Sequence, residues 1–314
     1  MKSAQIQKLR IFLDRLESDY QHIEFLSSDP LEFVHRYSNP WDQEAVALLS
    51  SVLAYGNVKQ IRKSIDEALK RMAQISDSPK DFIRRLSEAR FEKKATQVFE
   101  GYVYRFHSGE DILQLFQLIR QSWSQYGSLG DHFLSLLQPE DPHIESALIG
   151  LIAEWRDWTR PSVSKYFFHL LPSPQDGSCC KRGCLFLRWM GRKDQLDLGL
   201  WSGPSPYLKS KNRLRPNQLI MPLDTHTGRI SQYMGFTSRK SLNWKAALEV
   251  TETLKKIDPV DPTRYDFALA RLGILNICQR SYRKEICHQC QLQPGCQFAQ
   301  KSSPGLLPSI LFSH

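Results

Sequence analysis

The segment that says most about the fold runs from Cys278 to Cys296 and has the sequence CQRSYRKEICHQCQLQPGC. Its four cysteines, Cys278, Cys287, Cys290 and Cys296, follow the spacing C-x8-C-x2-C-x5-C. Four thiolates from one short loop can hold a [4Fe–4S] cluster. Zinc ribbons instead use two close pairs of cysteines separated by a longer loop, and Cys287 and Cys290 alone form a close pair here. The spacing therefore favours an iron–sulfur cluster, with zinc as the alternative.

Basic residues crowd the same loop. They are Arg280, Arg283, Lys284 and His288. Their positive charge would offset the negative charge of a thiolate-bound cluster, and it would also suit contacts with phosphate groups. The loop is therefore expected to be a small basic module at one surface of the protein.

Composition points to a folded, basic protein. Of the 314 residues, 41% are hydrophobic and 11% aromatic, which argues against disorder. Lys and Arg number 42 against 33 Asp and Glu, a net charge of +9 that suits a polyanion such as DNA or RNA. The N-terminus lacks the apolar core of a signal peptide, and no apolar run has the length of a membrane span. We expect a cytoplasmic protein without membrane contact, in which thiols stay reduced and clustered cysteines bind metal.

Helical periodicity dominates the chain, and strand-like alternation is scarce. We predict an all-α fold in which Asp42 is the N-cap of the helix that follows it. The expected helices are Leu9–Leu16, Ala45–Leu53, Ile61–Met72, Phe82–Leu86, Ile112–Trp123, His132–Leu137, Ile144–Trp155, Leu185–Met190 and Ala246–Ile257.

The segment from Lys181 to Arg215 combines charge with aromatic residues. It holds nine basic and two acidic residues, and Trp189, Trp201 and Tyr207 lie among them. Interleaved cations and aromatic rings are typical of a nucleic-acid surface. The alternative is a basic loop that contacts solvent.

The cysteine run, which ends in CHQCQLQPGC, resembles the C-terminal cluster loop of endonuclease III and the adenine glycosylases. These enzymes belong to the helix-hairpin-helix (HhH-GPD) DNA glycosylase superfamily, in which the first cysteine interval is slightly shorter and the other two match. The resemblance implies two helical subdomains, which we expect at residues 41–222 and at 1–40 plus 223–300, with a tail at 301–314. Taken whole, the chain also resembles an uncharacterised bacterial family, domain of unknown function 2400.

The stretch Pro222–Ile230, PLDTHTGRI, resembles the superfamily segment that carries the catalytic aspartate, followed by Thr-His and then an arginine. The resemblance makes Asp224 the candidate catalytic carboxylate and Arg229 a candidate DNA contact. The alternative for Asp224 is a helix N-cap, and the two roles are compatible because a cap residue lies at a helix mouth.

In the superfamily, the motif Leu-Pro-Gly-x-Gly-x-Lys provides the nucleophile. Here Leu171-Pro172 is followed, after an insertion, by Gly177 and then by Lys181, with Cys179 in place of the second glycine. Lys181 is therefore the candidate nucleophile, and its alternative is a basic helix-start residue that contacts phosphate or solvent. Between Lys181 and Asp224 lie 42 residues, more than in endonuclease III, and residues 182–222 form the basic, aromatic insert.

The stretch EAVALLSSVLAYGN, residues 44–57, resembles an early glycosylase helix whose end lies near DNA, and its alternative is an ordinary core helix. The resemblance implies that side chains here enter the gap left by a flipped base. The residues expected to contact nucleic acid are Tyr55, Asn57, Gly177, Arg182, Arg188, Arg192, Lys193 and Arg229.

The resemblance implies a monomeric base-excision DNA glycosylase and AP lyase that acts on double-stranded DNA. A target base inside a duplex must be rotated into a pocket before any group can attack its sugar. Two alternatives stay open: a non-catalytic iron–sulfur protein that binds DNA or RNA, and a zinc-stabilised RNA-processing or tRNA-modifying protein. Three further cysteines, Cys179, Cys180 and Cys184, are expected to be buried small residues at a helix start, with redox sensitivity as the alternative.

Overall fold

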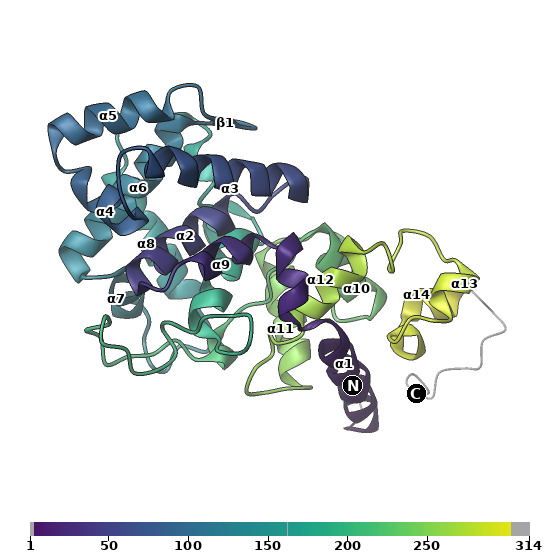
Figure 1. Ribbon diagram of the computed structural model, residues 1–314. Helices are drawn as coiled ribbons and strands as arrows, with labels where there is room; N and C mark the ends of the chain where they lie inside the picture. The colour runs from purple at the N-terminus through teal and green to yellow at the C-terminus, as the bar shows by residue number, and fades with distance from the viewer. Residues whose placement is uncertain (1–2, 162, 303–314) are drawn as a thin grey trace.

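The computed structural model describes residues 3–161 and 163–302, and it is mainly helical (Figure 1). Its α-helices are α1 (Ser3–Tyr20), α2 (Pro40–Val52), α3 (Val58–Ala73), α4 (Pro79–Arg85), α5 (Ala89–Phe99), α6 (Gly109–Tyr126), α7 (Leu129–Leu136), α8 (Glu145–Trp158), α9 (Lys181–Gly191), α10 (Thr225–Tyr233), α11 (Trp244–Lys255), α12 (Asp266–Ile274), α13 (Lys284–Cys287) and α14 (Gln297–Ser302). Short 3-10 helices are η1 (Ile23–Ser28), η2 (Pro30–Arg36), η3 (Phe167–His169), η4 (Pro174–Asp176), η5 (Pro216–Gln218) and η6 (Gln293–Gly295). The strands β1 (Val103–Tyr104) and β2 (His107–Ser108) pair antiparallel.

The predicted all-α class is therefore confirmed at the level of helix content, apart from this small hairpin. Within the residues that the structure covers, no helix is long and apolar enough to cross a membrane. Helix α5 and the β1–β2 hairpin were not expected from the sequence.

The predicted N-cap of the second helix is wrong by three residues. The side chain of Asn39 caps α2 by accepting a hydrogen bond from the backbone N–H of Trp41, and Pro40 occupies the first turn, where its missing N–H costs nothing. Asp42 instead accepts a hydrogen bond from the backbone N–H of Lys80, at 2.6 Å. This bond ties α2 to the start of α4, so Asp42 links two helices rather than starting one.

The helices form two neighbouring groups (Figure 1). Helix α2 packs against α4 and α9, whereas α12 packs against α1 and α10. The N-terminal helix thus lies beside a helix near the other end of the sequence. Around the expected boundary at residue 40, η2 packs on α2 and α3, and the buried apolar residues form one cluster that spans both groups. The division into two subdomains stays a prediction. Of the expected tail 301–314, residues 303–314 lie outside the described residues.

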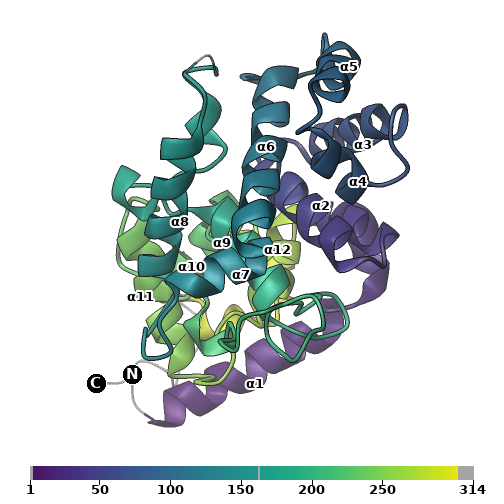
Figure 2. The ribbon, with the colours of Figure 1, turned by 90° about the vertical axis from the view of Figure 1, so that its left-hand side faces the viewer.

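The segment after α9 is an irregular loop that returns to the helices (Figure 2). Trp189 in α9 and the loop residues Trp201 and Tyr207 are buried, which corrects the expectation that these aromatic residues face nucleic acid. Trp201 and Tyr207 share one buried hydrogen-bond acceptor, Glu44 in α2. Its carboxylate accepts hydrogen bonds from the indole Nε1 of Trp201, at 3.0 Å, and from the hydroxyl of Tyr207, at 3.5 Å.

Glu44 has three further donors. The backbone N–H groups of Leu129 and Gly130 and the indole of Trp123 lie 2.8 to 2.9 Å from its oxygens. A fully buried carboxylate needs such donors, because an unpaired buried charge is costly. Burial still raises the pKa of Glu44 to about 7, although these donors oppose the shift. One acid in the middle of an apolar helix thereby fixes the insert against α2, α6 and α7.

Candidate active site

A cavity of about 370 Å³ lies where α2 ends and where α9, α10 and α12 begin. The two candidate catalytic residues, Lys181 and Asp224, both line it. The wall also includes Tyr55 from the segment after α2 and Asp266 from the first turn of α12. Residues that are far apart in the sequence therefore meet at the converging ends of four helices.

Lys181 is the first residue of α9, and its Nζ donates a hydrogen bond to the backbone oxygen of Ala54, at 2.9 Å. The chain enters the helix through Cys180, which has a φ of 50°, a left-handed conformation that non-glycine residues rarely adopt. The thiol of Cys179 donates to the backbone oxygen of Leu223, at 3.2 Å. This bond joins the segment before Lys181 to the residue before Asp224, so it helps to hold the two candidate residues in one pocket.

Asp224 is the N-cap of α10, which was the alternative role predicted for it from the sequence. It also lies in the pocket. Its Oδ1 accepts hydrogen bonds from the backbone N–H groups of His226, at 2.7 Å, and Thr227, at 2.9 Å. Burial alone would raise the pKa of Asp224, but the charge of Lys181 and these two N–H groups hold the pKa below its ordinary value. The side chain is therefore a carboxylate at neutral pH, and no described residue donates a hydrogen bond to Oδ2.

A second carboxyl group in the pocket, Asp266, was not singled out from the sequence. It is buried, its Oδ2 accepts a hydrogen bond from Arg188, and its Oδ1 has no partner among the described residues. Burial raises its pKa to about 6 despite Arg188, and the charge of Asp224 acts in the same direction. The available signal was an acid at the start of the helix DFALARLGI, which is apolar apart from Asp266 and Arg271. Asp266 can change protonation state near neutral pH, as Asp224 does not.

Arg188 and Arg192 do not face a phosphate backbone as expected. Their side chains are buried, with exposed fractions of 2% and 5% for the residues. Arg188 bonds to Asp197 and Asp266, and the carboxylates around Arg192 are those of Glu17, Asp194, Asp197 and Asp261. Buried charges require such pairing. The prediction is wrong because nearby acids of the same segment and distant acids such as Glu17, Asp261 and Asp266 meet these cations inside the protein.

Arg182 is also buried, in contrast to the expectation of a DNA contact. Its guanidinium lies 4.8 Å from the ring centre of Tyr55 and donates a hydrogen bond to the backbone oxygen of His169. Burial lowers its pKa to about 10. Tyr55 itself is half-buried, and its hydroxyl has no hydrogen-bond partner in the described structure. Arg182 therefore supports Tyr55 from behind, and Tyr55 forms part of the pocket wall.

The other expected contact residues are at the surface or partly so. Asn57 is exposed, but its side chain caps α3 by accepting from the backbone N–H of Lys59. Gly177 is exposed with a φ of 73°, and Lys193 is exposed. Arg229 lies in an open groove of about 580 Å³ together with Arg280, and it donates to the backbone oxygen of Cys278, at 2.9 Å. Arg229 thus connects the middle of α10 to the cysteine segment.

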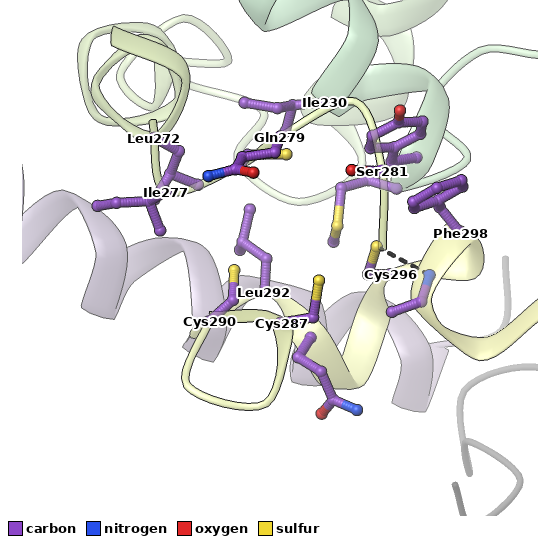
Figure 3. A pocket seen from close by; sticks show the side chains of 15 residues that line it. Ile230, Leu272, Ile277, Gln279, Ser281, Cys287, Cys290, Leu292, Cys296 and Phe298 are labelled. Carbon is purple, nitrogen blue, oxygen red and sulfur yellow. Dashed lines mark hydrogen bonds between the residues drawn. The ribbon is translucent and has the colours of Figure 1, made fainter. Parts of the chain in front are cut away.

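The four candidate metal ligands line one cavity, which is mainly apolar. Figure 3 shows Cys287, Cys290 and Cys296 around this cavity, with Leu292 and Phe298 beside them. Burial raises the pKa of Cys278 to about 11, and it also raises the pKa values of Cys290 and Cys296. In the parts of the chain that the structure covers, no three His, Cys, Asp or Glu side chains converge as a single metal ion would require.

Two of the three cysteines near Lys181 are buried in the protein core. Cys180 and Cys184 are fully buried, and burial raises the pKa of Cys180 to about 12 and also raises the pKa of Cys184. A protonated, buried thiol reacts poorly. Their arrangement matches the role of small residues at a helix start.

The fold and the site define a mainly helical protein with a lysine–aspartate pocket and a separate cysteine-lined cavity. A family model described as "Protein of unknown function (DUF2400)" matches residues 29–275, and the chain belongs to this family. The matched range includes Lys181, Asp224 and Asp266 and ends before Cys278. No curated protein and no solved structure matches the chain.

Proposed function

We propose that this protein is a DNA-repair enzyme, a base-excision DNA glycosylase and AP lyase with Lys181 as nucleophile and Asp224 as its electrostatic partner. The observation that carries the proposal is that Lys181 and Asp224 line one pocket although 42 residues separate them. The pocket volume of about 370 Å³ falls within the range of roughly 300–1,000 Å³ that is usual for small-ligand sites. A flipped nucleoside is a ligand of this kind.

The proposed reaction follows from the charges of the two residues. As the bond between the base and C1′ breaks, the base leaves with the bonding electrons and takes up a proton, and C1′ becomes electron-poor. The carboxylate of Asp224 stabilises that positive character. The neutral Nζ of Lys181 forms a bond to C1′, and opening of the sugar ring gives an iminium. Loss of a C2′ proton then expels the 3′ phosphate and cleaves the strand.

Lys181 must first release a proton and its hydrogen bond to Ala54. Asp266 is suited to accept that proton, because it lies in the same pocket, has an unpartnered oxygen and has a pKa raised to about 6. In this scheme the two carboxyl groups differ in role. Asp224 stays ionised, and Asp266 exchanges a proton.

The proposal includes a helix-hairpin-helix glycosylase-like fold and a [4Fe–4S] cluster held by Cys278, Cys287, Cys290 and Cys296. The common cavity of these residues supports a shared metal group, and the spacing of the four cysteines favours a cluster over zinc. The bound group would brace the basic loop for DNA, and no step of the reaction involves it. Protein purified without oxygen should contain iron and absorb visible light. Stoichiometric zinc without iron would support the zinc alternative.

The substrate proposed is double-stranded DNA in the cytoplasm, bound by a monomer.

The test is incubation of the purified protein with duplexes that each carry one damaged or abasic nucleotide, followed by separation of cleaved strands. Wild-type protein should cleave at least one of them. Lys181→Gln should abolish strand cleavage, and Asp224→Asn should reduce it strongly. A matched control is Lys245→Gln, which removes an exposed lysine of α11 outside the pocket and should cleave normally. No cleavage of any duplex by wild-type protein would contradict the proposal.

A non-catalytic nucleic-acid-binding protein of the same fold is the second candidate. The bond from Lys181 Nζ to Ala54 favours it, because that bond holds the amine in a structural role. A binder would retain its affinity for DNA in the Lys181→Gln variant and would have no cleavage to lose. The duplex experiment therefore separates the two candidates.

A further inference from the structure

Two exposed aromatic residues lie against each other near the pocket. Phe106 and Tyr166 have exposed fractions of 58% and 46%, and they are the aromatic members of the exposed large apolar side chains in the described chain. Their ring centres are 5.5 Å apart, with an angle of 32° between the planes. Contact between two rings removes part of their surface from water, yet about half of each remains exposed. Paired exposed aromatic rings are more informative than a single exposed apolar residue.

Cations flank this pair. Arg105 precedes Phe106 in the β1–β2 turn, and Lys165 precedes Tyr166, with its Nζ 5.1 Å from the tyrosine ring centre. Both cations are exposed, and neither forms an ion pair within the described part of the chain. Arg105 has a φ of 54°. A two-residue hairpin loop favours turns with a positive φ, so the pairing of β1 with β2 accounts for this conformation.

A continuous series of ring contacts leads from this pair to the pocket. Phe106 contacts His169 at a ring separation of 6.3 Å, and His169 contacts Tyr55 at 5.3 Å. Tyr55 lines the pocket that holds Lys181. The Arg105 side chain also lies over the Tyr55 ring, at 5.4 Å, and beside Gly56. The exposed pair therefore lies one layer of side chains away from the pocket wall, at the end of the β1–β2 hairpin (Figure 1).

These observations favour a nucleobase over a protein as the occupant. An aromatic face accepts any flat base by stacking, and cations without carboxylate partners suit the phosphates on either side of it. A protein-binding surface would be expected to offer a wider apolar patch than two rings. The nearby carboxylate Asp111 is buried, so it does not oppose a polyanion at the surface.

We propose that Phe106 and Tyr166 form a platform, flanked by Arg105 and Lys165, that stacks an unpaired nucleobase of the DNA strand beside the pocket. The inference rests on the proposed function only in taking nucleic acid as the partner. It adds a preference for locally unpaired DNA, provided by a hairpin outside the elements that carry Lys181 and Asp224. The base that occupies the platform would neighbour the one that enters the pocket.

The test uses the full-length protein and two duplexes that each contain the fluorescent base 2-aminopurine. In one duplex the 2-aminopurine is unpaired, and in the other it is paired. Wild-type protein should bind the duplex with the unpaired base more tightly and should quench its fluorescence by stacking. Phe106→Ala and Tyr166→Ala should each weaken that binding by roughly 5- to 150-fold, the usual effect of losing one stacked base, and should leave the affinity for the fully paired duplex unchanged. They should also relieve the quenching.

The control variant is Val103→Ala, which changes an equally exposed apolar residue of the same hairpin and should bind both duplexes as wild type does. The thermal melting of each variant checks that the hairpin change leaves the fold intact. Unchanged binding and quenching in both aromatic variants would overturn the platform while leaving the glycosylase proposal standing. Platform-dependent binding without any Lys181-dependent cleavage would support the platform and overturn the glycosylase. Equal loss of affinity for both duplexes would also overturn the platform, because stacking acts on the unpaired base alone.

Discussion

Two regions of this protein combine basic and aromatic residues, and the structure buries one and exposes the other. In residues 181–215, Trp189, Trp201 and Arg188 are buried. In the β1–β2 turn and the segment near residue 166, Phe106 and Tyr166 are exposed. The first region is long and conspicuous in the sequence, and the second is short. Composition alone therefore does not decide which of the two meets a partner.

Buried partners explain the difference. Trp201 and Tyr207 find Glu44, and Arg188 finds Asp266, each far away in the sequence. Once donors and charges are matched inside the protein, the surrounding apolar groups can also leave water. Phe106 and Arg105 have no such acid beside them among the described residues.

The largest expected effect is on the buried ion pairs. Arg188→Met leaves the carboxylate of Asp266 buried without its ion-pair partner and leaves Asp197 with Arg192 alone, so the free energy of unfolding should fall by about 3–5 kcal/mol. Urea denaturation at neutral pH measures this change. The control is Lys193→Met in the same basic segment, whose exposed side chain should shift the free energy by no more than about 0.5 kcal/mol. If Arg188→Met lowered the free energy of unfolding as little as Lys193→Met does, both cations would lie at the surface. The comparison between the two regions would then fail.

Glu44 should give the insert a pH-dependent stability. Its pKa is raised from 4.5 to about 7, so between these values the folded protein holds a proton that the unfolded chain has released. Stability should therefore decrease as pH rises from about 4.5 to 7, by up to about 3 kcal/mol for this group. Glu44→Gln removes that ionisation. The difference in unfolding free energy between wild type and variant should change with pH across this window, and a constant difference would contradict the raised pKa.

The sequence predicted part of this account for physical reasons that can be named. Helix positions followed from local periodicity, and the motifs around Lys181 and Asp224 singled out two residues that the fold then brings into one pocket. Asp266 and Glu44 were missed because an acid in an apolar helix carries no local sign of its distant donors. The β1–β2 hairpin was missed because two-residue strands show no alternation to detect.

The smallest expected effect on stability belongs to the exposed pair. Phe106→Ala should change the free energy of unfolding by no more than about 0.5 kcal/mol, because more than half of the residue is already in water. Chemical denaturation measures the change, with Phe116→Ala as a buried comparison that should lose about 3–5 kcal/mol. A large loss in Phe106→Ala would mean that the ring supports the fold, and the contrast between the two regions would disappear.

The central claim is that the pocket places a reactive lysine against the sugar of a flipped nucleotide. The most direct measurement is borohydride reduction during incubation with an abasic duplex, followed by mass spectrometry of the digested protein. A covalent DNA adduct on the peptide that contains Lys181, lost in Lys181→Gln, is the predicted result. An adduct on a different residue, or no adduct in protein that cleaves the duplex, would contradict the account.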